Sequence, residues 1–226
     1  MPARVGLGLL LAHLGRTGKS LEVLKRGQEI DPTDVQIVKM MGHAHFVERN
    51  FDKALACYLA SSKFQPSFDN PHYWMARAYL ALTNYTAAIE QFEKRDLLGG
   101  SEPTETTQRY DELRRALLEG GISNYWRAAL TQAQAQIDPK NEPYIFAQIY
   151  ARLGEKDQSF EWLERAYESR NQLTYLIIDE FWDPWREEPR FKAVIAKIGL
   201  EGYEKRWRQR LSTHRAMEQQ AEKVRR

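Results

Sequence analysis

The side chains in this sequence that could do chemistry are few, and their spacing does not favour it. His43 and His45 lie two positions apart in a predicted helix, so they point to different faces and make a poor metal chelate. Cys57 lies in an apolar helical stretch, where a small buried residue is expected rather than a nucleophile. We therefore predict neither a metal site nor a covalent catalyst at these positions.

Carboxylates are concentrated in one later stretch, which holds Asp179, Glu180, Asp183, Glu187 and Glu188. Most of them have the neighbours expected of turn and helix-cap residues, and density alone does not predict a catalytic acid and base. The chain also lacks the motifs of phosphate loops, dinucleotide-binding folds, kinases and nucleophile elbows. These observations predict a protein that is not an enzyme and holds no cofactor.

The composition is that of a folded helical protein of ordinary charge. The chain has 226 residues, of which 42% are hydrophobic and 28% are charged, with 33 Lys and Arg against 31 Asp and Glu. Its single cysteine excludes an intramolecular disulfide, and no apolar run reaches the roughly 18 residues that a membrane span requires. We expect a protein of the cytoplasm, with the periplasm as the alternative.

The elements that must position any site repeat along the chain, and residues 35–68 are the clearest unit. They predict two short helices joined by a turn, with small residues at Gly42 and Ala54 where the helices approach closely. Tyr58 fills the space beside them, and Pro66 marks the exit. Neither helix could bury its apolar face alone, so neighbouring units must supply the rest of the core.

This spacing of small, aromatic and proline positions resembles the tetratricopeptide repeat (TPR). The same register predicts three repeats over residues 1–100 and a fourth over residues 140–172. Residues 101–139, interrupted at Gly120 and Gly121, are interpreted as a degenerate helix pair that continues the stack. The resemblance implies an all-α, right-handed superhelix of antiparallel helix pairs that acts as a protein-interaction scaffold.

Residues 175–200 resemble the closing segment of a bacterial family of TPR proteins that ends in a DPRF-type motif. The motif stands here as DPWREEPRF, from Asp183 to Phe191, with Trp185 where leucine is usual. Such segments accompany DNA-binding, cyclase or kinase domains, so the resemblance implies the sensory or regulatory half of a bacterial signalling or transcription-regulator system. No such effector domain is recognised in this sequence.

A second implication of the TPR resemblance concerns the concave groove, which the fifth and ninth positions of each repeat usually face. In this register those positions are Lys39, His43, Tyr73, Arg77, Tyr144 and Gln148. The cluster would suit a protein or peptide partner with an acidic group, and the alternative is a set of ordinary solvated residues. His43 and Trp74 stand where the carboxylate clamp of chaperone-binding TPR domains has asparagines, so chaperone tails are not expected.

The two ends of the chain differ from the middle. The first helix is apolar on almost every side, which predicts self-association, a preceding domain or a missing repeat at that end. Residues 173–226 are predicted to form a cap and a basic helical tail, in which Tyr203, Trp207 and Leu211 would pack on the last repeat. The tail, residues 201–226, carries eight basic and four acidic residues. Because it lacks a base-reading motif, we do not expect nucleic acid as the partner.

Overall fold

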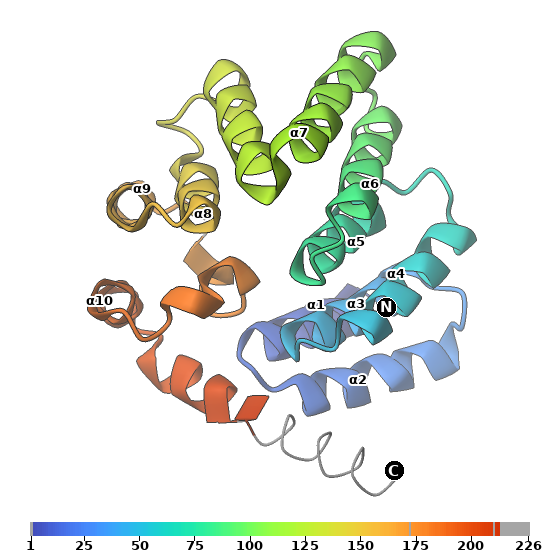
Figure 1. The fold of residues 1–226 in the computed structure, drawn as a ribbon. Helices are drawn as coiled ribbons and strands as arrows, with labels where there is room; N and C mark the ends of the chain where they lie inside the picture. Colours follow the sequence, from blue (N-terminus) through green and yellow to red (C-terminus); the bar gives the residue numbers. More distant parts are fainter. Residues whose placement is uncertain (1, 172, 210, 213–226) are drawn as a thin grey trace, which may run out of the picture.

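The computed structural model describes residues 2–171, 173–209 and 211–212, and within these ranges the protein is helical, with no strand. Successive helices pack as antiparallel pairs that follow one another around an arc (Figure 1). The elements are α1 (Pro2–His13), α2 (Thr17–Ile30), α3 (Val35–Val47), α4 (Phe51–Phe64), α5 (Asn70–Ala81), α6 (Tyr85–Leu98), α7 (Pro103–Gln136), α8 (Pro143–Leu153), α9 (Lys156–Glu168), two short 3₁₀ helices η1 (Leu173–Tyr175) and η2 (Glu180–Trp185), and α10 (Pro189–Lys197). The predicted all-α, TPR-like solenoid is confirmed.

Small residues stand where the two helices of a pair approach most closely. A Cβ atom built on Gly42 would lie 2.7 Å from the ring of Tyr58, and Ala54 on the facing helix is fully buried. In the first pair the hydroxyl of Ser20 donates to the Gly8 carbonyl at 2.7 Å. The residue types that define the repeat in the sequence therefore act as spacers in the structure.

The turn inside each of the first three pairs contains one residue with a left-handed backbone. Gly15, Arg49 and Thr83 have φ values of 67°, 62° and 60°, and they recur at the 34-residue period of a TPR. The asparagine that follows Arg49 and Thr83 caps the next helix: Asn84, for example, accepts from the Ala87 backbone N–H at 3.1 Å. Arg49 and Thr83 hold a conformation that glycine adopts more easily.

Helix α7 is broken at the predicted pair of glycines. Gly120 and Gly121 have non-helical backbone angles, and the two halves of α7 diverge from this point as a V (Figure 1). Tyr110 and Leu113 are buried on the first half, as are Tyr125 and Trp126 on the second. Helix α6 packs on one side of α7 and α8 on the other, so this region continues the stack of helices.

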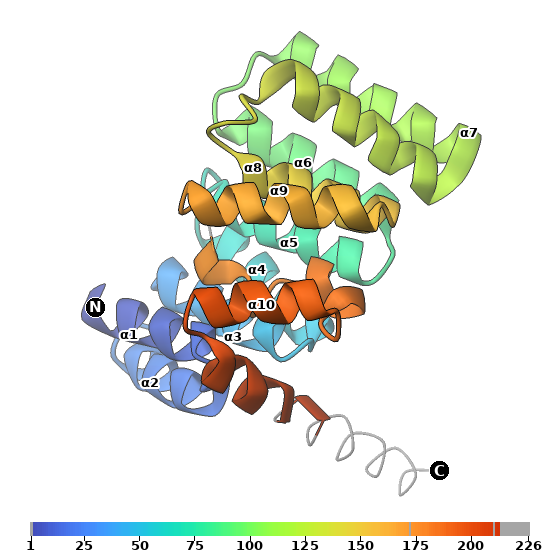
Figure 2. The same ribbon diagram turned by 90° about the vertical axis from the view of Figure 1, so that its left-hand side faces the viewer.

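The C-terminal segment returns to the first repeats. After α10 a helical stretch over residues 201–209 runs beside α1 and α2 (Figures 1 and 2). Trp207 is buried there, and its indole N–H donates to the Val47 carbonyl at 3.1 Å. We predicted that this helix would pack on the last repeat. In the structure it bridges the two ends of the arc, which the curvature of the solenoid brings together, and Trp207 belongs to a core cluster with residues of both ends. The rest of the predicted basic tail, residues 213–226, lies outside the described residues.

The first helix is covered on one side only. Leu9 packs against the cluster formed by Leu24, Ile37 and Met40, whereas Leu7 and Leu10 are 46% and 55% exposed. Self-association through this end stays a prediction. Within the described part of the chain, no helix is long and apolar enough to cross a membrane.

Candidate functional site

The inner face of the arc contains a cavity of about 500 Å³. All six residues predicted for the groove line it: Lys39 and His43 from α3, Tyr73 and Arg77 from α5, and Tyr144 and Gln148 from α8. The TPR register therefore brings side chains from three helices to one place, up to 109 positions apart in the chain. That they bind a partner stays a prediction.

Part of the wall comes from a segment that the groove prediction did not include. Residues 175–186, here called the inner segment, enter the concave face and contribute Tyr175, Ile178, Asp179 and Glu180 to the cavity. The segment contains η2, and the N-cap residue Asp179 that precedes this helix accepts from the Phe181 backbone N–H at 3.0 Å. The chain thus places one of its own acidic, aromatic segments where an acidic peptide partner was expected.

Arg77 is engaged by this segment. Its Nε and Nη2 donate to the two carboxylate oxygens of Glu180 at 2.8 and 2.7 Å, and Nη2 also donates to Asp179 at 2.8 Å. Its Nη1 donates to the Tyr73 hydroxyl at 3.0 Å, and the guanidinium lies 4.3 Å from the centre of the Phe181 ring. Arg77 is buried, and it donates three hydrogen bonds to two carboxylates of the same chain, which a partner's carboxylate would have to displace. That Arg77 binds a partner stays a prediction.

Asp179 connects α8 to the same network. Its second carboxylate oxygen accepts from the Tyr144 hydroxyl at 2.7 Å and from the Gln148 amide at 2.5 Å. The indole of Trp182 donates to the Tyr144 oxygen at 3.0 Å. Tyr144 and Gln148 line the cavity, but their polar ends hold the inner segment in place.

Burial and ion pairing shift the pKa values of Asp179 and Arg77 in opposite directions, and ion pairing has the larger effect. Burial alone would raise the pKa of Asp179, but Arg77 and the donors around the carboxylate hold that pKa below its usual range. Burial likewise opposes the charge of Arg77, while Glu180, Tyr73 and Asp179 keep the pKa of the guanidinium well above its usual value. Both groups are therefore ionised at neutral pH.

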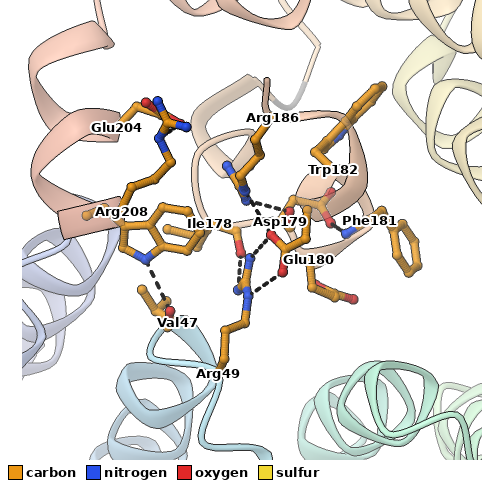
Figure 3. Close-up of polar contacts among 12 residues, drawn as sticks. Val47, Arg49, Ile178, Asp179, Glu180, Phe181, Trp182, Arg186, Glu204 and Arg208 are labelled. Carbon is orange, nitrogen blue, oxygen red and sulfur yellow. Dashed lines mark hydrogen bonds and ion pairs between the residues drawn. The ribbon is translucent and has the colours of Figure 1, made fainter. Parts of the chain in front are cut away.

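A second cluster ties the inner segment to the first repeats (Figure 3). Arg49 donates to the Ile178 carbonyl at 2.6 Å and to both oxygens of Asp183 at 2.7 and 2.8 Å. Arg186 donates to the Asp179 carbonyl and to Asp183. The indole of Trp207 contacts both guanidinium groups, with its ring centre 4.9 Å from that of Arg49 and 4.2 Å from that of Arg186.

Lys39 differs from these arginines. It is 9% exposed, lines the cavity, and makes no ion pair with any carboxylate of the described residues. Its ammonium lies 5.0 Å from the centre of the Phe68 ring. Burial lowers the pKa of Lys39, and Asp69 opposes this shift without contacting the ammonium. One buried cation of the inner face is thus left without a partner anion.

His43 is paired with a histidine of the first helix. The Nε2 atoms of His13 and His43 are 3.1 Å apart, so one ring donates a proton to the other. Burial lowers the pKa of His13 to about 4; burial, with His13, Lys39 and Arg77, lowers the pKa of His43 to about 3. Both rings are neutral at pH 7, and His43 packs edge-on against Trp74 with ring centres 4.5 Å apart.

Sequence reasoning interpreted Asp179 and Glu180 as turn or cap residues; Asp179 does cap η2, but the pairing of both carboxylates with Arg77 was missed. A signal was present, because they interrupt a short apolar run, residues 176–182, in which a solvated carboxylate is unexpected. Cys57 is partly buried, and burial raises the pKa of its thiol, which does not favour a nucleophile. Over residues 2–171, 173–209 and 211–212, no group of three metal-ligating side chains could hold an ion.

Comparison with known families agrees with the repeat register. Residues 39–98 and residues 144–173 each match a family model described as tetratricopeptide repeat. No curated protein sequence matches the chain. The matches cover the repeats that supply Lys39, Tyr73, Arg77 and Tyr144 to the cavity, and such repeats generally form non-catalytic scaffolds for protein interaction. The chain therefore carries tetratricopeptide repeats, and it uses their inner face to build the cavity.

Proposed function

We propose that this chain is a non-enzymatic protein-interaction scaffold that binds an acidic protein or peptide partner on the inner face of its repeats. The observation that supports the proposal is the inner segment itself. It is an acidic, aromatic stretch held on the inner face by Arg77, which binds its carboxylates, and by Arg49, which donates to the Ile178 main-chain carbonyl. This face thus has the donors that an acidic peptide would require.

The six cavity residues have two roles in this proposal. Arg77, Tyr144 and Gln148 hold the inner segment and so shape the wall. Lys39 supplies the charge that attracts the partner, and the half-buried Tyr73 supplies flat contact area beside it. His43, neutral and buried, supports Trp74 from behind.

A second candidate is the sensory or regulatory half of a bacterial signalling system in the cytoplasm, whose effector domain lies elsewhere. The exposed Leu7 and Leu10 of α1 favour it, since apolar surface at the end of a helical stack suits docking of another unit. A scaffold and a regulatory module can be the same molecule, and the inner face would then be its sensing surface.

The test selects binders from a displayed peptide library against the full chain and measures their affinity for variants. Peptides that use the inner face should bind at least tenfold more weakly to Tyr73→Ala and to Lys39→Met. Lys53→Met, which removes an exposed lysine from α4, is the matched control and should change nothing. Peptides that bind all variants equally would place the interaction elsewhere.

The basic tail is the competing site, and it needs its own variant. Truncation after Leu200 would remove the buried Trp207 and so disturb the fold. A chain ending at Ser212 keeps Trp207 and loses only the residues beyond it. If this chain loses the selected peptides while Lys39→Met retains them, the tail carries the binding and the inner-face proposal fails.

A further inference from the structure

The cavity on the inner face is lined partly by the inner segment. Tyr175, Ile178, Asp179 and Glu180 of that segment and Leu9 of α1 contribute to the same wall. Its volume of about 500 Å³ lies in the range typical of small-molecule sites. The space therefore suits a compact ligand, or the last residue or two of a larger one.

The walls differ in character along the cavity. Trp74, Phe46, Leu9 and Met40 offer aromatic and apolar surface, and the hydroxyl of Tyr73 already accepts from Arg77. Asp179 and Glu180 are ion-paired and would repel an anion at their end. The polar and apolar surfaces together favour a ligand with a flat apolar body and one charged end.

Lys39 determines the sign of that charge. It is a buried residue of the cavity wall that makes no ion pair within the described part of the chain, whereas Arg49, Arg77 and Arg186 each contact a carboxylate. The carboxylate of Asp69 favours its charged form, without an ion-pair contact between the two. A buried charge without a counter-ion is unfavourable to folding, and a bound anion would remove that cost.

We infer that the cavity binds a small organic acid, with its carboxylate at Lys39 and an aromatic or apolar body against Trp74 and Leu9. This inference rests on the proposed function, because it names the ligand chemistry of the same inner face. The inference goes beyond the proposed function because it assigns the cavity to a free small molecule. The scaffold would then respond to a low-molecular-weight acid. A carboxylate at the C-terminus of a partner shares the chemistry and is a separate arm of the test.

The experiment is isothermal titration of the full chain with phenylacetate, 3-phenylpropionate and indole-3-acetate, each against its neutral amide. At least one acid should bind tenfold or more tightly than its amide. Lys39→Met should remove that difference, while Lys53→Met should preserve it. Asp69→Asn should strengthen binding of the acid, because it removes the carboxylate nearest to Lys39. Circular dichroism of each variant establishes that the fold is kept.

Several outcomes would overturn the inference. If none of the acids binds, if acid and amide bind equally, or if Lys39→Met keeps the preference, the small acid is not the ligand. A tripeptide ending in a free phenylalanine carboxylate forms the last arm. If it binds more tightly than every small acid and its amide does not, the carboxylate belongs to a partner's C-terminus. Failure of the acids together with Lys39-dependent binding of selected peptides would leave the scaffold proposal intact.

Discussion

The two ends of the inner face use groove-facing repeat positions in opposite ways. At one end Arg77, at the ninth position of its repeat, donates three hydrogen bonds to Asp179 and Glu180. At the other end Lys39, at the fifth position of the neighbouring repeat, lines the cavity without an ion pair to any carboxylate of the described residues. We call these the Arg77 end and the Lys39 end.

The difference between them shows how a closing segment divides a binding surface. The inner segment converts one half of the concave face into core, with hydrogen bonds and ion pairs that an incoming partner would have to replace. At the Lys39 end it leaves a cavity whose wall contains a buried cation. Positions that the repeat register predicts to face the groove can thus hold the protein's own chain in one repeat and line a cavity in the neighbouring one.

The largest expected effect is at the Arg77 end. Arg77→Met keeps an unbranched apolar stem but leaves Asp179 and Glu180 buried without their cation. We expect a loss of about 3–5 kcal/mol in the free energy of unfolding, as for a broken buried ion pair. Urea denaturation followed by circular dichroism measures it.

The control for this variant removes the orphaned charges as well. Arg77→Met combined with Asp179→Asn and Glu180→Gln should recover part of the loss, because no unpaired charge remains. An Arg77→Met chain as stable as the wild type would show that the inner segment does not depend on Arg77, and the contrast between the two ends would disappear.

The pairing of Arg77 with Asp179 also shows where sequence reasoning stops. Gly42, Ala54 and Tyr58 were assigned correctly because their roles are local: the residues lie within one helix pair, and residue size alone determines which can face which. Arg77 and Asp179 are 102 residues apart, and their contact depends on the curvature of the whole stack. The sequence around either residue does not predict that curvature. The groove-facing positions could therefore be predicted, but not that the inner segment lies against them.

The second prediction concerns pH and isolates the Lys39 end. The pKa values of His13 and His43 are about 4 and about 3 in the folded protein, against about 6.5 in an unfolded chain. The folded state therefore favours the neutral rings. The unfolded chain takes up protons first as pH falls, so this stability is complete above about pH 6.5 and is lost progressively toward about pH 4.

Urea midpoints between pH 7.5 and 4.5 measure this slope, which is up to about 1.4 kcal/mol per pH unit for each histidine. His43→Asn should flatten it, whatever its effect on absolute stability. His72 also has a lowered pKa and leaves a residual slope of the same sign in both proteins. The depressed pKa of Asp179 acts only at lower pH, so the Arg77 end does not enter this window. Equal slopes in both proteins would refute the assignment.

A third prediction removes the unpaired cation. Lys39→Met keeps the apolar stem and eliminates the buried charge, whose described contact is the ring of Phe68. We expect the free energy of unfolding to stay the same or to rise by up to about 1 kcal/mol, since the desolvation penalty and the cation–π contact nearly offset each other. A loss above about 1 kcal/mol by urea denaturation would instead make Lys39 a structural residue like Arg77.

The smallest effect compares two equivalent turns, one at the inner segment and one away from it. Arg49 and Thr83 both have a left-handed backbone, which costs a residue with a side chain about 1 kcal/mol relative to glycine. Thr83 is exposed, so Thr83→Gly should raise the free energy of unfolding by about 0.5–1 kcal/mol.

Arg49→Gly removes the same backbone strain but loses the bonds to Ile178 and Asp183, so it should lower the free energy of unfolding by about 1 kcal/mol. The two variants should therefore shift the urea midpoint in opposite directions. If Arg49→Gly stabilises the protein as Thr83→Gly does, the contacts of Arg49 contribute nothing measurable, and the inner segment is held by Arg77, Tyr144, Gln148 and the packing around them.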